Sequence, residues 1–164
     1  MKRTGKCIQL LVLCGALLVG ASTATGGIAG ASAISTYEKK ADAICRAYQS
    51  SNQQIPSSAS ATKALQMFSQ NISNLSTGIR KLEALPRPKK EASALSTAYA
   101  SADSLVALSN KAYNALKEGN ESELNSLSAK LTRESKALNS KFQSLGLRTC
   151  STVTCRSSAA DSHT

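Results

Sequence analysis

The side chains with the most distinctive chemistry after residue 34 are three cysteines, Cys45, Cys150 and Cys155. A structural zinc site uses four cysteine or histidine ligands, usually in closely spaced pairs. The three cysteines lack that spacing, and the single histidine, His163, stands one residue from the end of the sequence. We therefore predict no metal site and no other cofactor, and we interpret the cysteines as partners in disulfides.

No group of residues in the sequence predicts catalysis. General acid–base chemistry needs a histidine or a pair of carboxylates held together in a pocket, and a nucleophilic serine needs a base and an orienting partner. The ten acids are spread over predicted outer faces, and Glu38, Glu121 and Glu123 suit positions near helix N-termini. There is no glycine-rich phosphate loop either. We predict that the chain is not an enzyme.

Two further groups of side chains have both a functional and a structural interpretation. Asp42 and Arg46 could form a polar site beside Cys45, but their spacing of four is that of an ordinary ion pair on a helix surface, which contributes about 0.3 kcal/mol. The four tyrosines could line a ligand cleft, but they are more typical of core edges with hydrated hydroxyls. They are Tyr37, Tyr48, Tyr99 and Tyr113. We favour the structural interpretation for both groups.

The chain is strongly basic, with 20 lysines and arginines against 10 acids. Such a surface is attracted to anionic lipid headgroups or wall polymers. The densest cluster, Arg87, Lys89 and Lys90, is therefore a candidate contact with an anionic surface, although a solvated turn has the same composition. We expect no nucleic-acid binding, because the cations are scattered and there is no tryptophan and little other aromatic surface for base stacking.

The first 33 residues have the three parts of a signal peptide. Lys2, Arg3 and Lys6 are followed by an apolar run over residues 8–19. A stretch of small residues then ends in Ala31-Ser32-Ala33, the small-x-small pattern at which signal peptidase cleaves. This order predicts export and a mature chain that begins at Ile34, with a secreted or cell-envelope location.

The leader allows two alternatives. Residues 7–37 contain no charge, so an uncleaved leader is long enough to anchor the chain in a membrane. The small residues and the adjacent glycines Gly26 and Gly27 make its second half only weakly apolar, which favours cleavage. Lipidation at Cys14 is the second alternative, and it is disfavoured because Leu13 stands where a small residue is expected.

Beyond the leader, apolar residues recur at spacings of three and four, which is the pattern of one face of a helix. No segment alternates as a half-buried strand would. The four predicted faces are Tyr37, Ala41, Ile44 and Tyr48; Ala61, Leu65, Phe68, Ile72, Leu75, Ile79 and Leu82; Ala92, Leu95, Tyr99, Ala102, Val106, Ser109, Tyr113 and Leu116; and Leu124, Leu127, Leu131, Leu138, Phe142 and Leu145. The second face is a heptad seam over more than three repeats.

Local signals set the ends of these helices. Ser35 with Glu38 is a capping box that starts the first helix, and Asn120 with Glu123 is a second one that starts the fourth. The signals that end helices are Pro56, the corner Leu85-Pro86-Arg87-Pro88, Gly119, and Gly146 followed by Leu147 as a hydrophobic latch. These boundaries divide the chain into a signal peptide over 1–33, a helical bundle domain over 34–150 and a disordered tail over 151–164.

Four amphipathic helices with short connections predict an all-α, up-down antiparallel bundle, in which the second and third helices form a long central hairpin. The first and fourth helices are then neighbours, and the chain after Gly146 can return toward Cys45. Because an exported chain meets oxidising conditions, we favour a Cys45–Cys150 disulfide. A local Cys150–Cys155 bond is the alternative. With the favoured pairing, Cys155 is a free or intermolecular thiol.

Three segments of the chain resemble a group of uncharacterised exported actinobacterial small helical proteins. They are Ala41–Tyr48 (ADAICRAY), Leu82–Pro88 (LEALPRP) and Leu145–Cys150 (LGLRTC). The resemblance covers about residues 37–150. It implies a secreted helical protein in which the two outer cysteines pair, and it implies no activity. Cys155 and the tail lie outside the pattern.

These observations favour a non-catalytic exported or envelope interaction domain of unknown specificity. One alternative is a carrier that holds an apolar small molecule between its helices, which needs a cavity of at least about 300 Å³. Another is an envelope redox or stress protein that uses the unpaired cysteine.

Overall fold

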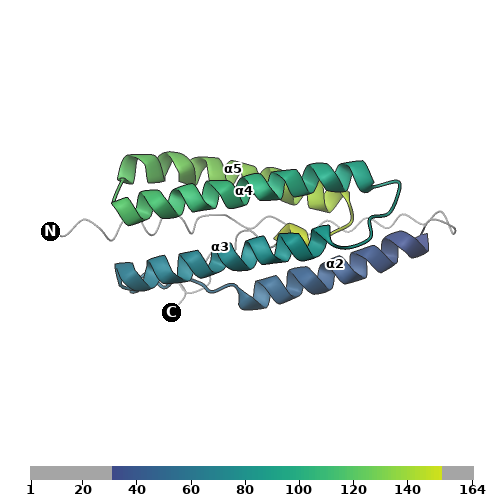
Figure 1. Ribbon diagram of the computed structural model, residues 1–164, viewed down its shortest axis with the longest axis horizontal. Helices are drawn as coiled ribbons and strands as arrows, with labels where there is room; N and C mark the ends of the chain where they lie inside the picture. The colour runs from purple at the N-terminus through teal and green to yellow at the C-terminus, as the bar shows by residue number, and fades with distance from the viewer. Residues whose placement is uncertain (1–30, 153–164) are drawn as a thin grey trace, which may run out of the picture.

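The computed structural model describes residues 31–152, and all of the regular structure in that range is helical. Four α-helices follow one another: α2 (Ala31–Ser51), α3 (Ala61–Glu83), α4 (Ala92–Glu118) and α5 (Glu121–Ser144). A short 3₁₀ helix, η2 (Cys150–Thr152), follows α5. The predicted all-α class with four helices is confirmed (Figure 1).

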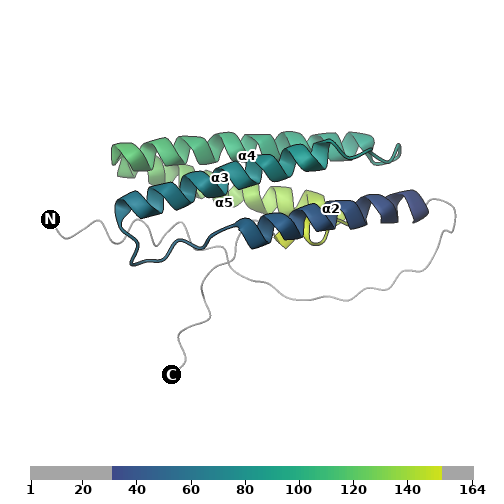
Figure 2. The same cartoon turned by 60° about the horizontal axis from the view of Figure 1, so that its bottom comes forward.

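Helices that are consecutive in the sequence pack against each other, α2 on α3, α3 on α4 and α4 on α5. All four lie along the long axis of the molecule, and α2 lies beside the C-terminal part of α3 rather than its whole length (Figures 1 and 2). The 3₁₀ helix η2 packs on both α5 and α2. The first and fourth helices are therefore joined chiefly through the returning chain.

Both predicted glycine stops end their helices in the left-handed conformation, with φ of 70° at Gly119 and 76° at Gly146. After α5, the N–H of Gly146 donates to the Gln143 carbonyl (3.0 Å) and the N–H of Leu147 to the Phe142 carbonyl (2.9 Å). This pair of bonds is a Schellman motif. Leu147 is fully buried, so the predicted hydrophobic latch is confirmed and starts the return of the chain toward α2.

The capping box at the start of α5 forms in a modified way. The Asn120 side chain accepts from the Glu123 N–H at 3.2 Å and donates to the Glu123 carboxylate at 3.0 Å. In the usual box the glutamate bonds the backbone N–H of the cap residue. Here that N–H already donates to the Ala115 carbonyl at the end of α4 (2.9 Å). The same residue thus ends one helix and starts the next.

The prediction that the first helix begins at Ser35 is wrong, because α2 begins at Ala31. Residues 31–34 include two alanines and no proline or glycine, so nothing stops the helix between Ala31 and Ser35. Glu38 consequently lies within α2 and takes another role. Its carboxylate covers Gly146 so closely that a Cβ at that position would overlap it.

Most of the buried side chains form one cluster, which extends from the middle of the bundle to the end where the proline corner joins α3 to α4. The cluster is Tyr37, Ala41, Cys45, Ile79, Leu82, Leu95, Ala98, Tyr99, Ala102, Leu105, Leu138, Phe142, Leu147 and Cys150. A smaller one, Ala112, Ala115, Leu124 and Leu127, lies near the α4–α5 turn. The predicted α5 face is confirmed at four buried residues, Leu124, Leu127, Leu138 and Phe142. The predicted α3 seam is confirmed at Ile72, Ile79 and Leu82.

The predicted α4 face is only half correct. One row, Leu95, Ala102 and Ser109, is buried as expected, but the second buried row is Ala98, Leu105 and Ala112. Val106, Tyr113 and Leu116 were expected in the interior and are only partly buried. Small residues allow helices to approach closely, so the alanines occupy the contact and the larger side chains flank it.

The first half of α3 is turned relative to the predicted seam. Ala64 and Met67 are buried, while Leu65 and Phe68 are half-buried and Ala61 is exposed. Residues 52–60 run beside this half of α3 in both views (Figures 1 and 2).

Asn71 on α3 holds this connecting segment in place. Its side chain accepts from the Gln53 N–H (2.9 Å) and donates to the Gln53 carbonyl (2.7 Å). A nearby bond from the Asn74 amide to the Ser51 carbonyl (2.9 Å) adds to this. This connecting segment, rather than α2, therefore lies beside the first half of α3.

We expect Gly78→Ala to raise the free energy of unfolding by about 0.5–1 kcal/mol, because glycine in a helix interior costs about that much relative to alanine. A Cβ at Gly78 would lie 3.7 Å from the Tyr48 side chain, an ordinary contact. Urea unfolding monitored by circular dichroism measures the change. Gly119→Ala is the control: it meets no neighbour, but its φ of 70° should make it destabilising. A loss of stability in Gly78→Ala would contradict this packing.

Candidate functional site

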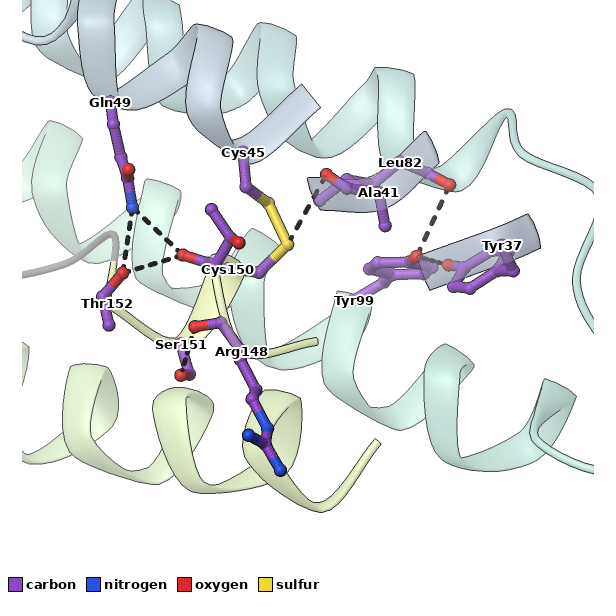
Figure 3. Close-up of a disulfide and its surroundings, with 11 residues drawn as sticks. Tyr37, Ala41, Cys45, Gln49, Leu82, Tyr99, Arg148, Cys150, Ser151 and Thr152 are labelled. Carbon is purple, nitrogen blue, oxygen red and sulfur yellow. Dashed lines mark hydrogen bonds between the residues drawn. A yellow bond between two sulfur atoms is a disulfide. The ribbon is translucent and has the colours of Figure 1, made fainter. Parts of the chain in front are cut away.

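The two predicted disulfide partners meet between α2 and η2. The Cys45 and Cys150 sulfurs are 2.04 Å apart and join positions separated by 105 residues (Figure 3). The exposed fractions are 4% for Cys45 and 1% for Cys150, so solvent does not reach the bond freely. Since the Cys150 sulfur is bonded to Cys45, the alternative Cys150–Cys155 pairing is not the one adopted.

Hydrogen bonds flank the disulfide on the side of the returning chain. The Gln49 side chain on α2 donates to the Thr149 carbonyl and to the Thr152 hydroxyl, both at 3.0 Å (Figure 3). Ser151, which was predicted to begin a disordered tail, is buried, and its hydroxyl donates to the Arg148 carbonyl at 2.7 Å. The ordered structure therefore continues through η2 to Thr152.

The predicted helix-surface ion pair between Asp42 and Arg46 does not form. Among the described residues, the ion pair present is Arg133–Glu134 on α5, at 3.7 Å and largely exposed. One Asp42 oxygen is shielded from solvent and has no hydrogen-bond partner, whereas Arg46 is exposed. The two side chains thus lie in different surroundings, although their spacing in the sequence is that of a pair.

A second link between helices lies toward the corner end of the bundle. The hydroxyls of Tyr37 on α2 and Tyr99 on α4 are hydrogen-bonded to each other, and the Tyr99 hydroxyl lies 3.4 Å from the Leu82 carbonyl on α3 (Figure 3). Both tyrosines are buried, so the expectation of hydrated hydroxyls is wrong for this pair. Tyr48 and Tyr113 are half-buried.

The tyrosine pair makes the fold sensitive to alkaline pH. Burial raises the pKa of Tyr99 well above its ordinary value of about 10, and the bond from Tyr37 raises it further. Burial also raises the pKa of Tyr37, although the bond to Tyr99 and the nearby Arg87 charge oppose that rise. The folded state therefore favours the neutral hydroxyls, and this contribution is complete below pH 10 and is lost as the pH rises beyond it.

We expect the stability of the chain to fall between about pH 10 and 12 as the unfolded tyrosines ionise. In Tyr37→Phe/Tyr99→Phe, which removes both partners, this part of the fall should disappear while stability at pH 7 changes little. Urea unfolding at a series of pH values tests it. Tyr113→Phe leaves the pair intact and should keep the wild-type profile; identical profiles for all three chains would refute the assignment.

An apolar hollow of about 30 Å³ lies in the interior beside the disulfide. Its lining includes both disulfide cysteines, Tyr48, Gly78 and Leu138. A single water needs about 10–15 Å³ measured in this way, whereas pockets for small organic ligands occupy about 300–1,000 Å³. The hollow is therefore a packing defect rather than a space for a carried molecule.

The proline corner between α3 and α4 carries exposed positive charge. We call Arg80, Lys81, Arg87, Lys89 and Lys90 the corner cluster, and all five side chains are exposed. The sequence singled out the last three. Arg80 and Lys81 were missed, although basic residues in the last turn of α3 were visible in the sequence.

Arg87 has a structural role within the corner cluster. Its guanidinium carbon lies 5.2 Å from the centre of the Tyr99 ring, and one of its nitrogens donates to the Ser96 hydroxyl at 2.6 Å. No such bond or ion pair to a described residue is seen for Lys89 or Lys90. Lys89 and Lys90 are therefore free cations of the corner, whereas Arg87 holds its shape.

Several predicted features lie outside residues 31–152, namely most of the signal segment, Cys14, Cys155 and His163. Within the described range, no cysteines, histidines and acids gather in a group that could hold a metal ion. None of the helices in that range combines the length and apolar character of a membrane-spanning segment. Comparisons with protein-family models, with curated proteins and with solved structures find no match for this chain.

Proposed function

We propose that the chain is exported, loses its leader before Ile34 and acts outside the cytoplasm as a non-catalytic binding domain for an anionic surface. The ligands would be lipid headgroups or an anionic wall polymer. The helices would form an up-down antiparallel bundle that presents the corner cluster at one end. The observation that carries the proposal is the set of exposed cations at this corner.

The charges around the corner are arranged unequally. All five cations are exposed, whereas the two acids in the same stretch, Glu83 and Glu91, are half-buried. One oxygen of Glu91 is shielded from solvent altogether. Negative charge is thus partly withdrawn from the surface while positive charge is displayed on it. A surface of this kind attracts polyanions through its summed field, without a shaped pocket.

The disulfide and the interior agree with this proposal. A buried disulfide is typical of a chain that folds in an oxidising compartment, which supports export. The small hollow favours binding on the surface rather than transport of an apolar molecule between the helices.

Binding of this kind should weaken steeply with salt. Between about 0.1 M and 1 M salt the Debye length falls from about 10 Å to about 3 Å. We therefore expect the full chain to bind anionic vesicles, or a soluble phosphodiester wall polymer, at low salt and to be released at high salt. Sedimentation with each ligand measures this. Salt-independent binding to the soluble polymer, or no binding to either ligand, would contradict the proposal.

A further inference from the structure

We propose that the bundle binds an anionic lipid surface end-on, with the corner cluster against the headgroups and the α4–α5 turn pointing away. This inference rests on the proposed function. It adds the choice of lipid as the surface and the orientation of the molecule on it.

The first observation is that the chain enters the bundle at the corner end. The start of α2 and the α3–α4 corner lie at the same end of the long axis in both views (Figures 1 and 2). The contacts agree, because Tyr37 in α2 bonds to Tyr99 and Arg87 covers the ring of that same tyrosine. In the sequence, the uncharged stretch over residues 7–37 thus ends in the part of α2 that lies beside the corner cluster.

This placement favours a membrane as the surface that the corner meets. Before it is cleaved, a leader inserted in the bilayer would hold the corner end of the bundle near the headgroups. A wall polymer would have no such relation to the end at which the chain enters.

The second observation is that charge differs between the two ends of the bundle. The exposed acids Glu118, Glu121 and Glu123 lie around the α4–α5 turn. Lysines in the same region balance them; these are Lys63, Lys111 and Lys117. At the corner end, Lys39 and Lys40 of α2 add to the corner cluster, and all of them are exposed. An anionic plane attracts the positive end more strongly than the balanced end, so it aligns the long axis with the membrane normal.

The third observation concerns the type of contact. The corner exposes no aromatic ring, since Arg87 covers Tyr99, and Leu85 is half-buried. Apolar insertion into the bilayer therefore contributes little. The contact is made by ammonium groups, above all those of Lys89 and Lys90, and each lysine near an anionic lipid surface strengthens binding about fivefold.

The test compares partition of the full chain into phosphatidylcholine vesicles with and without phosphatidylglycerol. The leader is present in every variant, so the ratio of the two partition coefficients reports the charged contact. We expect Lys89→Gln/Lys90→Gln to lower this ratio about 30-fold. The matched control is Lys130→Gln/Lys136→Gln, which removes two exposed lysines from the middle of α5 and should lower it much less. Equal losses in the two variants would overturn the inference.

Orientation has its own readout, in which a water-soluble amine acylating reagent is applied to the vesicle-bound wild-type chain. Mass spectrometry should show Lys81, Lys89 and Lys90 protected on vesicles that contain phosphatidylglycerol, while Lys63 and Lys117 react as in free protein. On phosphatidylcholine alone, where only the leader can bind, protection of the three corner lysines should be much weaker. Uniform protection along the bundle, or binding to a phosphodiester polymer but not to vesicles, would overturn the inference and leave the proposed function intact. Failure to bind either ligand would remove both.

Discussion

Replacing both cysteines of the Cys45–Cys150 disulfide with alanine is expected to lower the free energy of unfolding by about 2–5 kcal/mol. The bond joins residues 105 positions apart, and the chain-entropy model assigns about 4.7 kcal/mol to a loop of about 100 residues. The loss should be large for a second reason. The disulfide joins α2 to the returning chain, and η2 links α2 to α5. Urea unfolding without reductant measures the difference.

Cys155→Ala is the control for this experiment, because it removes a cysteine without touching the Cys45–Cys150 bond. Because no disulfide is lost, its stability should stay within about 0.5 kcal/mol of wild type. A double alanine variant within about 1 kcal/mol of wild type would mean that packing alone fixes η2 against α2.

Leu147→Ala is expected to destabilise the chain by about 2–5 kcal/mol, the range for truncating a fully buried leucine. The side chain is 0% exposed and belongs to the main core, although it lies after the end of α5. Its truncation leaves a cavity and weakens the turn that directs the chain toward Cys45. Thermal unfolding followed by circular dichroism measures the effect, and the same substitution at the half-buried Leu145 is its control.

The comparison of these two leucines distinguishes a latch from a simple helix end. If residues after Gly146 only frayed from α5, Leu145→Ala would be the more harmful change. We expect the opposite order, with Leu147→Ala costing clearly more.

The sequence alone predicted the number of helices, their approximate ends and the disulfide, because each depends on strong local or pairwise signals. The proline corner, the two left-handed glycines and the Asn120 cap act within a few residues. Cys45 and Cys150 were identified by the expected return of the chain. The local signals do not depend on how the helices pack, and the disulfide depends only on the path of the returning chain.

The wrong predictions concern which residues of α3 and α4 are buried, because packing between helices decides this. On α4 the larger side chains, Val106 and Tyr113, gave the stronger apolar pattern, but Ala98 and Ala112 occupy the helix contact. On α3 the connecting segment, bonded to Asn71, changes which residues are covered. Neither effect is visible in the spacing of apolar residues, because both depend on a neighbour that is distant in the sequence.

The sequence located three cations of the candidate site, but it did not show which of them are held by other side chains. Arg87, Lys89 and Lys90 look equivalent in the sequence, but only the lysines remain free once the Tyr99 ring and the Ser96 hydroxyl engage Arg87. The half-burial of Glu83 and Glu91 was equally invisible. Charge counts treat every acid and base alike, whereas the field outside the molecule depends on which of them face solvent.

The long span of the Cys45–Cys150 bond also sets an order of assembly. The helix pairs α2–α3, α3–α4 and α4–α5 are each local in sequence and can form before Cys150 has been synthesised. The thiol of Cys45 must wait for a partner 105 residues later. The Cys45–Cys150 bond can therefore form only after the end of the domain is available, and packing among the helices must position the two thiols before oxidation joins them.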